Sequence, residues 1–228
     1  PQMEFALWEK SLPHTYYCLH KDENGNLWIG DETGTLQCIN PSTHKTTSFY
    51  PQMTDGTSVG HIQKVYLCIH NKAWLVTDKG LFIFDHLNNK CIASLPYKDF
   101  QRITALYEDG DGVMWLGTNK GVYSALTEVG NIQLIGGYEE KMGITPAEVL
   151  AVYVNRHNQL YISYPDKIVQ TDDIHQNTSH IKIVQRDMVS GHIECIIDDK
   201  SGNTWMGNNI GIMTTYNKTK ASYTYMFP

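Results

Sequence analysis

Composition and charge already exclude several classes of protein. The chain has 228 residues, of which 41% are apolar and 11% aromatic, and a formal net charge of −6. This is enough apolar material for a sizeable core, but no lysine- or arginine-rich run offers the basic surface that nucleic acids require. No apolar run reaches the roughly 18 residues of a membrane span. We therefore expect neither nucleic-acid binding nor membrane contact from this segment.

The first unit of the chain predicts four short strands in succession. They are Thr15–His20, Asn26–Gly30, Thr35–Asn40 and Thr46–Tyr50, with a turn over residues 22–25. Turn signals recur throughout the chain at strand spacing, and no stretch shows sustained helical periodicity. Residues 144–154 could pass for a short helix, but Pro146 and the repeat spacing favour a loop followed by a strand. We expect almost no helix.

An aromatic residue recurs at an interval typical of propeller blades. The anchors are spaced 46, 41, 46 and 44 residues apart: Trp28, Trp74, Trp115, Tyr161 and Trp205. A period in the low forties is the length of one four-stranded blade. Three residues before each anchor stands glycine or asparagine, which enter the left-handed region most cheaply and suit a hairpin turn. These residues are Gly25, Asn71, Gly112, Asn158 and Gly202. The spacing predicts largely buried rings at Trp28, Trp115 and Trp205.

The predicted fold class is all-β. We expect a β-propeller segment of five four-stranded antiparallel blades, preceded by one extra N-terminal outer strand, within a single propeller region over residues 1–228. The extra strand is expected within residues 1–10, and the blades at 11–51, 52–97, 98–138, 139–186 and 187–228. This surplus strand favours a piece of a larger propeller of about six to eight blades. A closed five-bladed ring is the alternative.

The five cysteines fit a structural role better than a chemical one. Cys18 and Cys195 lie ten residues before their anchors, and Cys68 shares their side-chain parity, so we expect these three on crowded inner strands as small hydrophobes. Cys38 and Cys91 lie inside apolar stretches. Because no C-x-x-C pair occurs, zinc or thiol-redox chemistry is not expected.

Three segments resemble one known repeat. They are Asp22–Gly30, Asp109–Val122 and Asp199–Gly207. Each is similar to the two-component regulator propeller repeat, whose pattern is D-x-x-G-x-L-W-I-G-T-x-x-G-L. The second and fourth units match only the second half of the pattern or its spacing. The resemblance extends over essentially the whole chain.

This resemblance implies a sensory role. The repeat is typical of the extracytoplasmic sensor region of hybrid two-component histidine kinases in gut Bacteroidetes, a family that senses breakdown products of polysaccharides. The kinase and regulator modules of that family are absent from this chain. The resemblance therefore implies a periplasmic propeller that binds an oligosaccharide, uses no cofactor or metal, and is not an enzyme by itself.

Other propeller families fit the residues less well. A sialidase aspartate box would need an aspartate where Lys200 stands, and the three arginines occupy unrelated repeat positions. WD-type repeats would need Gly-His and Trp-Asp pairs in phase, and none occurs. A lyase of the streptogramin-lyase type needs a histidine base beside an acidic or metal-binding partner. Ten histidines are available, but none recurs with a carboxylate, so a lyase is the less favoured enzyme alternative.

We expect a saccharide-binding surface where the loops between second and third strands meet the linkers that enter each inner strand. Function in such folds usually lies on loops held by a rigid scaffold. The candidates are Asp31, Glu32, Thr118, Asn119, Tyr164, Asn208 and Asn209 in loops, with Arg102 and His192 in linkers. Tyr164 is expected to stack on a sugar ring. The paired acids Glu139 and Glu140 are expected to be solvated loop charges.

A second hypothesis gives the blades no ligand site of their own. An open arc of blades would expose apolar faces at its two ends, which favours self-association through propeller edges or contact with the remaining blades of a longer chain. The blades would then act as a dimerisation scaffold.

Overall fold

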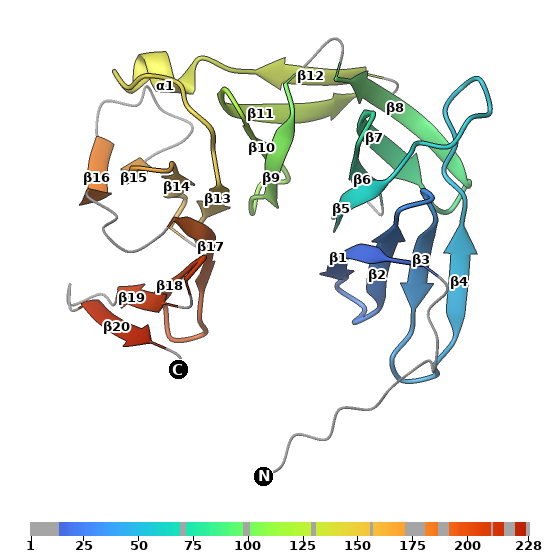
Figure 1. Ribbon diagram of the computed structural model, residues 1–228, viewed down its shortest axis with the longest axis horizontal. Helices are drawn as coiled ribbons and strands as arrows, with labels where there is room; N and C mark the ends of the chain where they lie inside the picture. The colour runs from blue at the N-terminus through green and yellow to red at the C-terminus, as the bar shows by residue number, and fades with distance from the viewer. Residues whose placement is uncertain are drawn as a thin grey trace. The chain divides into compact units, whose positions relative to one another are not determined.

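The computed structural model describes residues 14–68, 72–97, 101–128, 131–155, 157–171, 181–186, 192–210, 212–216 and 222–226 (Figure 1). The chain divides into two compact units, residues 1–94 and 95–228, which are treated separately below. Within the described ranges the strands form five four-stranded sheets, each paired antiparallel. The all-β propeller prediction is confirmed. The expected strand within residues 1–10 lies outside the described residues.

In the first unit two sheets follow in chain order. Blade 1 contains β1 Tyr16–Lys21, β2 Leu27–Asp31, β3 Leu36–Ile39 and β4 Thr46–Phe49. Blade 2 contains β5 Ile62–Leu67, β6 Lys72–Thr77, β7 Gly80–Asp85 and β8 Lys90–Pro96, whose last two residues fall in the second unit. In each sheet the strand order follows the chain.

The second unit contains the other three sheets. Blade 3 contains β9 Ile103–Glu108, β10 Met114–Thr118, β11 Gly121–Glu128 and β12 Asn131–Ile135. Blade 4 contains β13 Ala151–Val154, β14 Leu160–Ser163, β15 Lys167–Thr171 and β16 Ile181–Arg186. Blade 5 contains β17 Ile193–Asp198, β18 Thr204–Asn208, β19 Ile212–Tyr216 and β20 Ser222–Met226. A four-residue helix, α1 Tyr138–Lys141, lies between blades 3 and 4 in the chain, and residues 144–150 form the expected loop.

A side-chain hydrogen bond fixes the turn between the first two strands of three blades. The turn aspartate accepts the indole N–H of the anchor six residues later, and its other oxygen accepts backbone N–H groups of the turn. The bonds are Asp22–Trp28 (2.9 Å), Asp109–Trp115 (2.8 Å) and Asp199–Trp205 (3.0 Å). Blade 4 uses Asn155, whose Oδ1 accepts the backbone N–H groups of His157 and Gln159.

The predicted left-handed turn residues are also present. Gly25, Gly112, Asn158 and Gly202 have φ angles of 82°, 79°, 57° and 84°. Asn71 lies outside the described residues. Because glycine and asparagine reach this region at the lowest cost, the D-x-x-G half of the repeat is explained by turn geometry alone.

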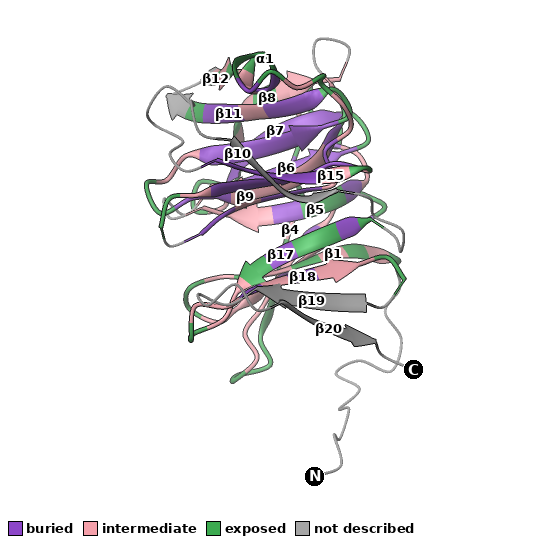
Figure 2. Ribbon diagram, turned by 90° about the vertical axis from the view of Figure 1, so that its left-hand side faces the viewer, coloured by how far each residue is buried: buried purple, intermediate pink, exposed green. Residues whose placement is uncertain are grey.

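Three anchor rings pack against the next blade of the same unit. We call the sheet face that carries the anchor the front face and the opposite face the back face. Trp28 lies in one apolar cluster with Ile62 and Val65 of blade 2. In the second unit, Trp115 lies in a cluster with Val149 and Val152, at the entry to blade 4 and on its inner strand. Tyr161 packs likewise against Ile193 and Ile196 of blade 5. Figure 2 shows the resulting burial along the middle strands β6, β7 and β10.

Three expectations about single residues are wrong. Trp28 and Trp115 are buried as predicted, but Trp205 is only half-buried. Cys68 does not lie on an inner strand: it follows β5, and Lys64 takes the inner-strand position because it pairs with Val76 as Cys18 pairs with Gly30. The turn of blade 2 is shortened, which shifted the predicted register. Of the remaining cysteines, Cys195 is exposed rather than part of the core.

Candidate functional site

A recurring backbone hydrogen bond joins the predicted loops to the predicted linkers. The N–H group of a residue in the loop after the second strand donates to the carbonyl of the residue at the entry to the inner strand. The pairs are Glu32–Thr15 (3.3 Å), Asp78–His61 (3.2 Å), Asn119–Arg102 (3.1 Å) and Asn209–His192 (3.2 Å). Each blade concerned therefore presents one loop residue beside one linker residue. Blade 4 differs, with the N–H of Leu150 bound to the carbonyl of Ser163 (2.8 Å).

Blade 3 presents an exposed charged and amide group. Arg102 donates from Nη2 to Oε1 of Glu148 at 3.3 Å, and both side chains remain substantially exposed. The exposed Asn119 is held beside them by its backbone bond to Arg102. Guanidinium, carboxylate and amide groups offer donors and acceptors together, so this group suits a hydroxylated ligand.

Blade 5 presents a second polar group. The backbone N–H of His192 donates to Oδ1 of Asn209 (2.8 Å), and the His192 Nδ1 lies 3.1 Å from the carbonyl oxygen of Pro165. Asn208 accepts the N–H of Ile210 and so shapes the loop. His192 and Asn209 are exposed, while Asn208 is half-buried. The structure thus brings together three of the predicted residues at this loop.

Two predicted binding residues serve the turns instead. Asp31 is fully buried, and its Oδ1 accepts the N–H groups of Thr33 and Thr35 at 2.9 and 2.8 Å. Thr118 is fully buried and donates to the carbonyl of Gly121 at 2.7 Å. Only Glu32, of the residues predicted in blade 1, faces solvent, where it lies 3.7 Å from His14.

Tyr164 cannot stack on a sugar, because its side chain is fully buried. Its hydroxyl donates to Oε1 of Glu139 at 2.9 Å, and the same oxygen accepts the N–H of Val122 at 2.7 Å. Glu139 is therefore no solvated loop charge: only 3% of it is exposed. Burial, together with the adjacent carboxylate, raises the pKa of Tyr164 well above its usual value. This acid ties the helix to β11 and to the loop that follows β14.

Two exposed residues were missed from the sequence. Glu148 completes the ion pair of Arg102, and Tyr50, in the segment that follows β4, is 67% exposed and offers an aromatic ring to solvent. Tyr50 stands beside Pro51 in a linker, which is the signal that could have found it. Nothing in the spacing of Glu148 marks it, since its partner lies 46 residues away.

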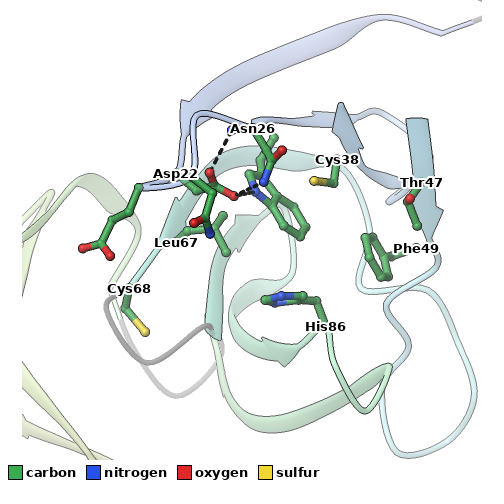
Figure 3. Close-up of a pocket in the computed structure, with 11 residues that line it drawn as sticks. Asp22, Asn26, Cys38, Thr47, Phe49, Leu67, Cys68 and His86 are labelled. Atoms are coloured by element: carbon green, nitrogen blue, oxygen red, sulfur yellow. Dashed lines mark hydrogen bonds between the residues drawn. The ribbon is translucent and has the colours of Figure 1, made fainter. Parts of the chain in front are cut away.

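A pocket of about 210 Å³ opens within the first unit, between blades 1 and 2 (Figure 3). Cys38, Thr47 and Phe49 lie on one side of it and Leu67 and Cys68 on the other. Two acidic residues, Asp22 and Glu23, line it, and the Asp22 carboxylate already accepts hydrogen bonds from the indole of Trp28 and from the backbone and side chain of Asn26. Burial alone would raise the pKa of Asp22, but these hydrogen bonds outweigh it and lower the pKa. The Asp22 carboxylate of this pocket therefore serves the turn.

Three of the cysteine thiols lack the environment of reactive groups. Burial raises the pKa of Cys18, Cys38 and Cys91 to about 11, which disfavours the nucleophilic thiolate. Among the described residues no cluster of three or more His, Cys, Asp or Glu side chains could hold a metal ion. In the same part of the chain, no helix has the length and apolar character needed to cross a bilayer.

The repeated sheets and their packed anchors define a β-propeller repeat protein. Residues 11–33 and 98–120 match the family described as the two-component regulator propeller. The chain therefore carries two-component regulator propeller repeats in these two segments. The matched segments contain two of the three clear copies of the pattern, and the copy at residues 199–207 lies outside them. A comparison with curated protein sequences gives no significant match.

Solved structures agree with this fold. The extracellular domain of a putative hybrid two-component system from Bacteroides thetaiotaomicron is 23% identical with a TM-score of 0.71, over 93% of this chain and 29% of that one. A second such domain from the same organism is 18% identical with a TM-score of 0.68, over 94% and 31%. Virginiamycin B lyase from Staphylococcus aureus is 14% identical with a TM-score of 0.68, over 93% and 70%. This chain thus spans less than a third of each of these two extracellular domains.

Proposed function

We propose that this chain is a ligand-sensing propeller segment from the extracytoplasmic, periplasmic region of a hybrid two-component histidine kinase. It has no catalytic role of its own, and its ligands are oligosaccharides released from polysaccharides. The observation that carries the proposal is the pair of matched regulator repeats. The likeness to extracellular domains of hybrid two-component systems supports it.

The loop groups of blades 3 and 5 are the proposed contact surface. Arg102, Glu148, Asn119, His192 and Asn209 are exposed polar side chains held by hydrogen bonds between loop and linker. Such groups bind hydroxyls by paired donors and acceptors. Backbone hydrogen bonds within the protein already hold these loops. Ligand binding therefore needs little reordering of the backbone, which lowers the entropic cost of association.

A thermal-shift titration with defined oligosaccharides tests this proposal. We expect one glycan class to raise the melting temperature with the logarithm of its concentration, with a stabilisation of about 2.7 kcal/mol at a hundredfold excess over the dissociation constant. Asn119→Ala or His192→Ala should weaken the shift. Asn24→Ala, an exposed asparagine in the β1–β2 turn, is the matched control and should leave it unchanged.

Two results would count against the proposal. If no glycan shifts the melting temperature, the chain has no saccharide site of its own, and the scaffold hypothesis gains. If a glycan is consumed with formation of product, the lyase alternative replaces the sensor. A shift that neither loop variant changes would move the site away from blades 3 and 5.

A further inference from the structure

The pocket between blades 1 and 2 lies within the first unit, so its walls do not depend on how the two units are placed. Its 11 lining residues all belong to the described part of the chain. Blade 1 supplies the β1–β2 turn and side chains of β2, β3 and β4, and blade 2 supplies the end of β5 and His86, which follows β7. A ligand bound here therefore contacts two neighbouring blades at once.

Three aromatic rings form the inner part of the pocket. Trp28 is its floor, because only 3% of this residue is exposed, and the half-buried Phe49 stacks on it at 5.6 Å between ring centroids. The ring of His86 meets Trp28 in a T-shaped contact at 5.0 Å and lies 6.2 Å from Phe49. Figure 3 shows His86 between Phe49 and Cys68. The interior of the pocket is therefore largely aromatic.

The edge of the pocket is acidic. Glu23 is exposed there and Asp22 is half-buried. Although burial opposes ionisation of Asp22, the hydrogen bonds that it accepts lower its pKa, so its carboxylate is charged at neutral pH. Lysine and arginine are absent from the 11 described residues that line the pocket. The lining thus carries two carboxylates and no lysine or arginine charge to balance them.

Size and the remaining hydrogen-bonding groups restrict the occupant. The pocket, at about 210 Å³, is smaller than the clefts of roughly 300–1,000 Å³ that hold drug-sized ligands. The amide of Asn26 is already used at both ends, since its Nδ2 donates to Asp22 and its Oδ1 accepts a bond from Asn40. Few neutral groups therefore remain to pair with the many hydroxyls of a saccharide. A compact cation fits better, because carboxylates and aromatic rings both attract positive charge.

The second unit builds the equivalent end of its blade interface differently. Between blades 3 and 4 the hydroxyl of Tyr107 donates to the carbonyl of Val154 at 2.9 Å. The strand pairing makes His20 the equivalent of Tyr107 and Leu67 the equivalent of Val154. His20 contacts the ring of Tyr66 at 4.6 Å, and Leu67 lines the pocket. The two interfaces therefore differ at the end where the pocket of the first unit lies.

We propose that this pocket binds a small organic cation, a quaternary ammonium or protonated amine with only a few carbon atoms. The carboxylates of Glu23 and Asp22 attract the charge at the edge, and the rings of Phe49 and His86 contact the alkyl groups inside. Because the ligand contacts both blades, its binding stabilises their packing. The proposal is independent of the saccharide surface, which is assigned to loops of the second unit.

Titration calorimetry of the whole chain with choline tests the proposal. The matched ligand is 3,3-dimethylbutan-1-ol, the uncharged carbon isostere of choline. At constant ionic strength we expect choline to bind at least about tenfold more tightly, the order of one desolvated cation–aromatic contact. Glu23→Gln should weaken choline binding by about threefold, as for an exposed charge pair, and leave binding of the alcohol unchanged. Glu140→Gln, an exposed glutamate of α1 in the second unit, is the matched control and should change neither.

Two further readouts locate the bound choline. Cys68 is half-buried in the pocket wall, whereas Cys195 is exposed in the second unit. Saturating choline should slow the alkylation of Cys68 by iodoacetamide and leave that of Cys195 unchanged, as measured by peptide mass spectrometry. Phe49→Leu keeps an apolar side chain but removes a ring, so it should weaken choline binding. Circular dichroism shows whether this variant folds.

Three outcomes would overturn the proposal. Equal affinity for choline and its isostere, or no binding of either, means that the pocket is no cation site. Equal weakening by Glu23→Gln and Glu140→Gln means that the net charge of −6, not the pocket, attracts choline. Binding that leaves Cys68 as reactive as before lies elsewhere. None of these outcomes bears on a glycan-induced shift, so failure of this proposal is distinguishable from failure of the sensor proposal.

Discussion

Trp115 provides the most direct test of the blade interface. Its ring is 1% exposed within the cluster shared with blade 4, and its indole N–H donates to Oδ2 of the buried Asp109 at 2.8 Å. Trp115→Ala removes both contributions, and we expect a loss of about 3–5 kcal/mol in the free energy of unfolding, as for other large core truncations. Trp115→Phe keeps most of the packing but deprives the carboxylate of a donor, at a cost of about 1–3 kcal/mol.

Urea unfolding followed by far-ultraviolet circular dichroism measures these losses, because the signal does not depend on tryptophan emission. Trp205→Ala is the matched control: that ring makes the same bond to Asp199 but is only half-buried. Its cost should fall clearly below that of Trp115→Ala. A loss below about 1 kcal/mol for Trp115→Ala would refute the packing argument, given the usual cost of such a truncation. Equal losses at the two positions would refute the role assigned to the next blade.

Three other perturbations have defined outcomes. Gly117→Ala should cost about 1–3 kcal/mol in urea unfolding, because its Cβ atom meets backbone-anchored neighbours at 2.7–3.0 Å; Gly110→Ala, with nothing within 4 Å, should be neutral, and equal costs would contradict the argument. Glu139→Ala leaves a buried N–H and a tyrosine hydroxyl without their acceptor and should cost at least about 2 kcal/mol, whereas Glu139→Gln keeps an oxygen acceptor and should cost less. Burial lowers the pKa of His20 in the folded chain, so the unfolded chain takes up the His20 proton at a higher pH than the folded chain does. The contribution of neutral His20 to the free energy of unfolding is therefore complete above about pH 6.5 and declines as the pH falls. Melting temperatures should therefore fall more steeply below pH 6.5 in the wild type than in His20→Gln, and parallel curves would exclude a contribution from His20.

Local chemistry made much of the fold predictable. The turn after the inner strand needs a residue with positive φ, and glycine or asparagine marks it; the strand that follows carries an aromatic anchor. Both signals depend only on neighbours along the chain, so the predicted strands of blade 1 lie within one residue of β1–β4 at each end. Blade 2 has a shorter segment between its first two strands, and there the prediction wrongly placed Cys68 on the inner strand.

The candidate site was less predictable, because a polar residue can contact a ligand only where the folded chain leaves its side chain exposed. Asp31, Thr118 and Tyr164 are polar loop residues in the sequence, yet the structure uses all three inside turns or against a buried acid. Glu139 looks like an ordinary surface charge until Tyr164, 25 residues away, is placed against it. Contacts over such separations follow from how blades pack, and no local pattern records them.

The sequence by itself therefore determined the repeat, the strand order and the turn chemistry, because the signals for each strand and turn come from residues that are neighbours along the chain. The tertiary structure decided which of the repeated positions are covered. Leu19 and Val65 are equivalent aliphatic residues on equivalent strands, but one is exposed and the other buried. The difference comes from the neighbouring sheet, because hydrophobic burial depends on the surface that lies opposite and not on the residue alone.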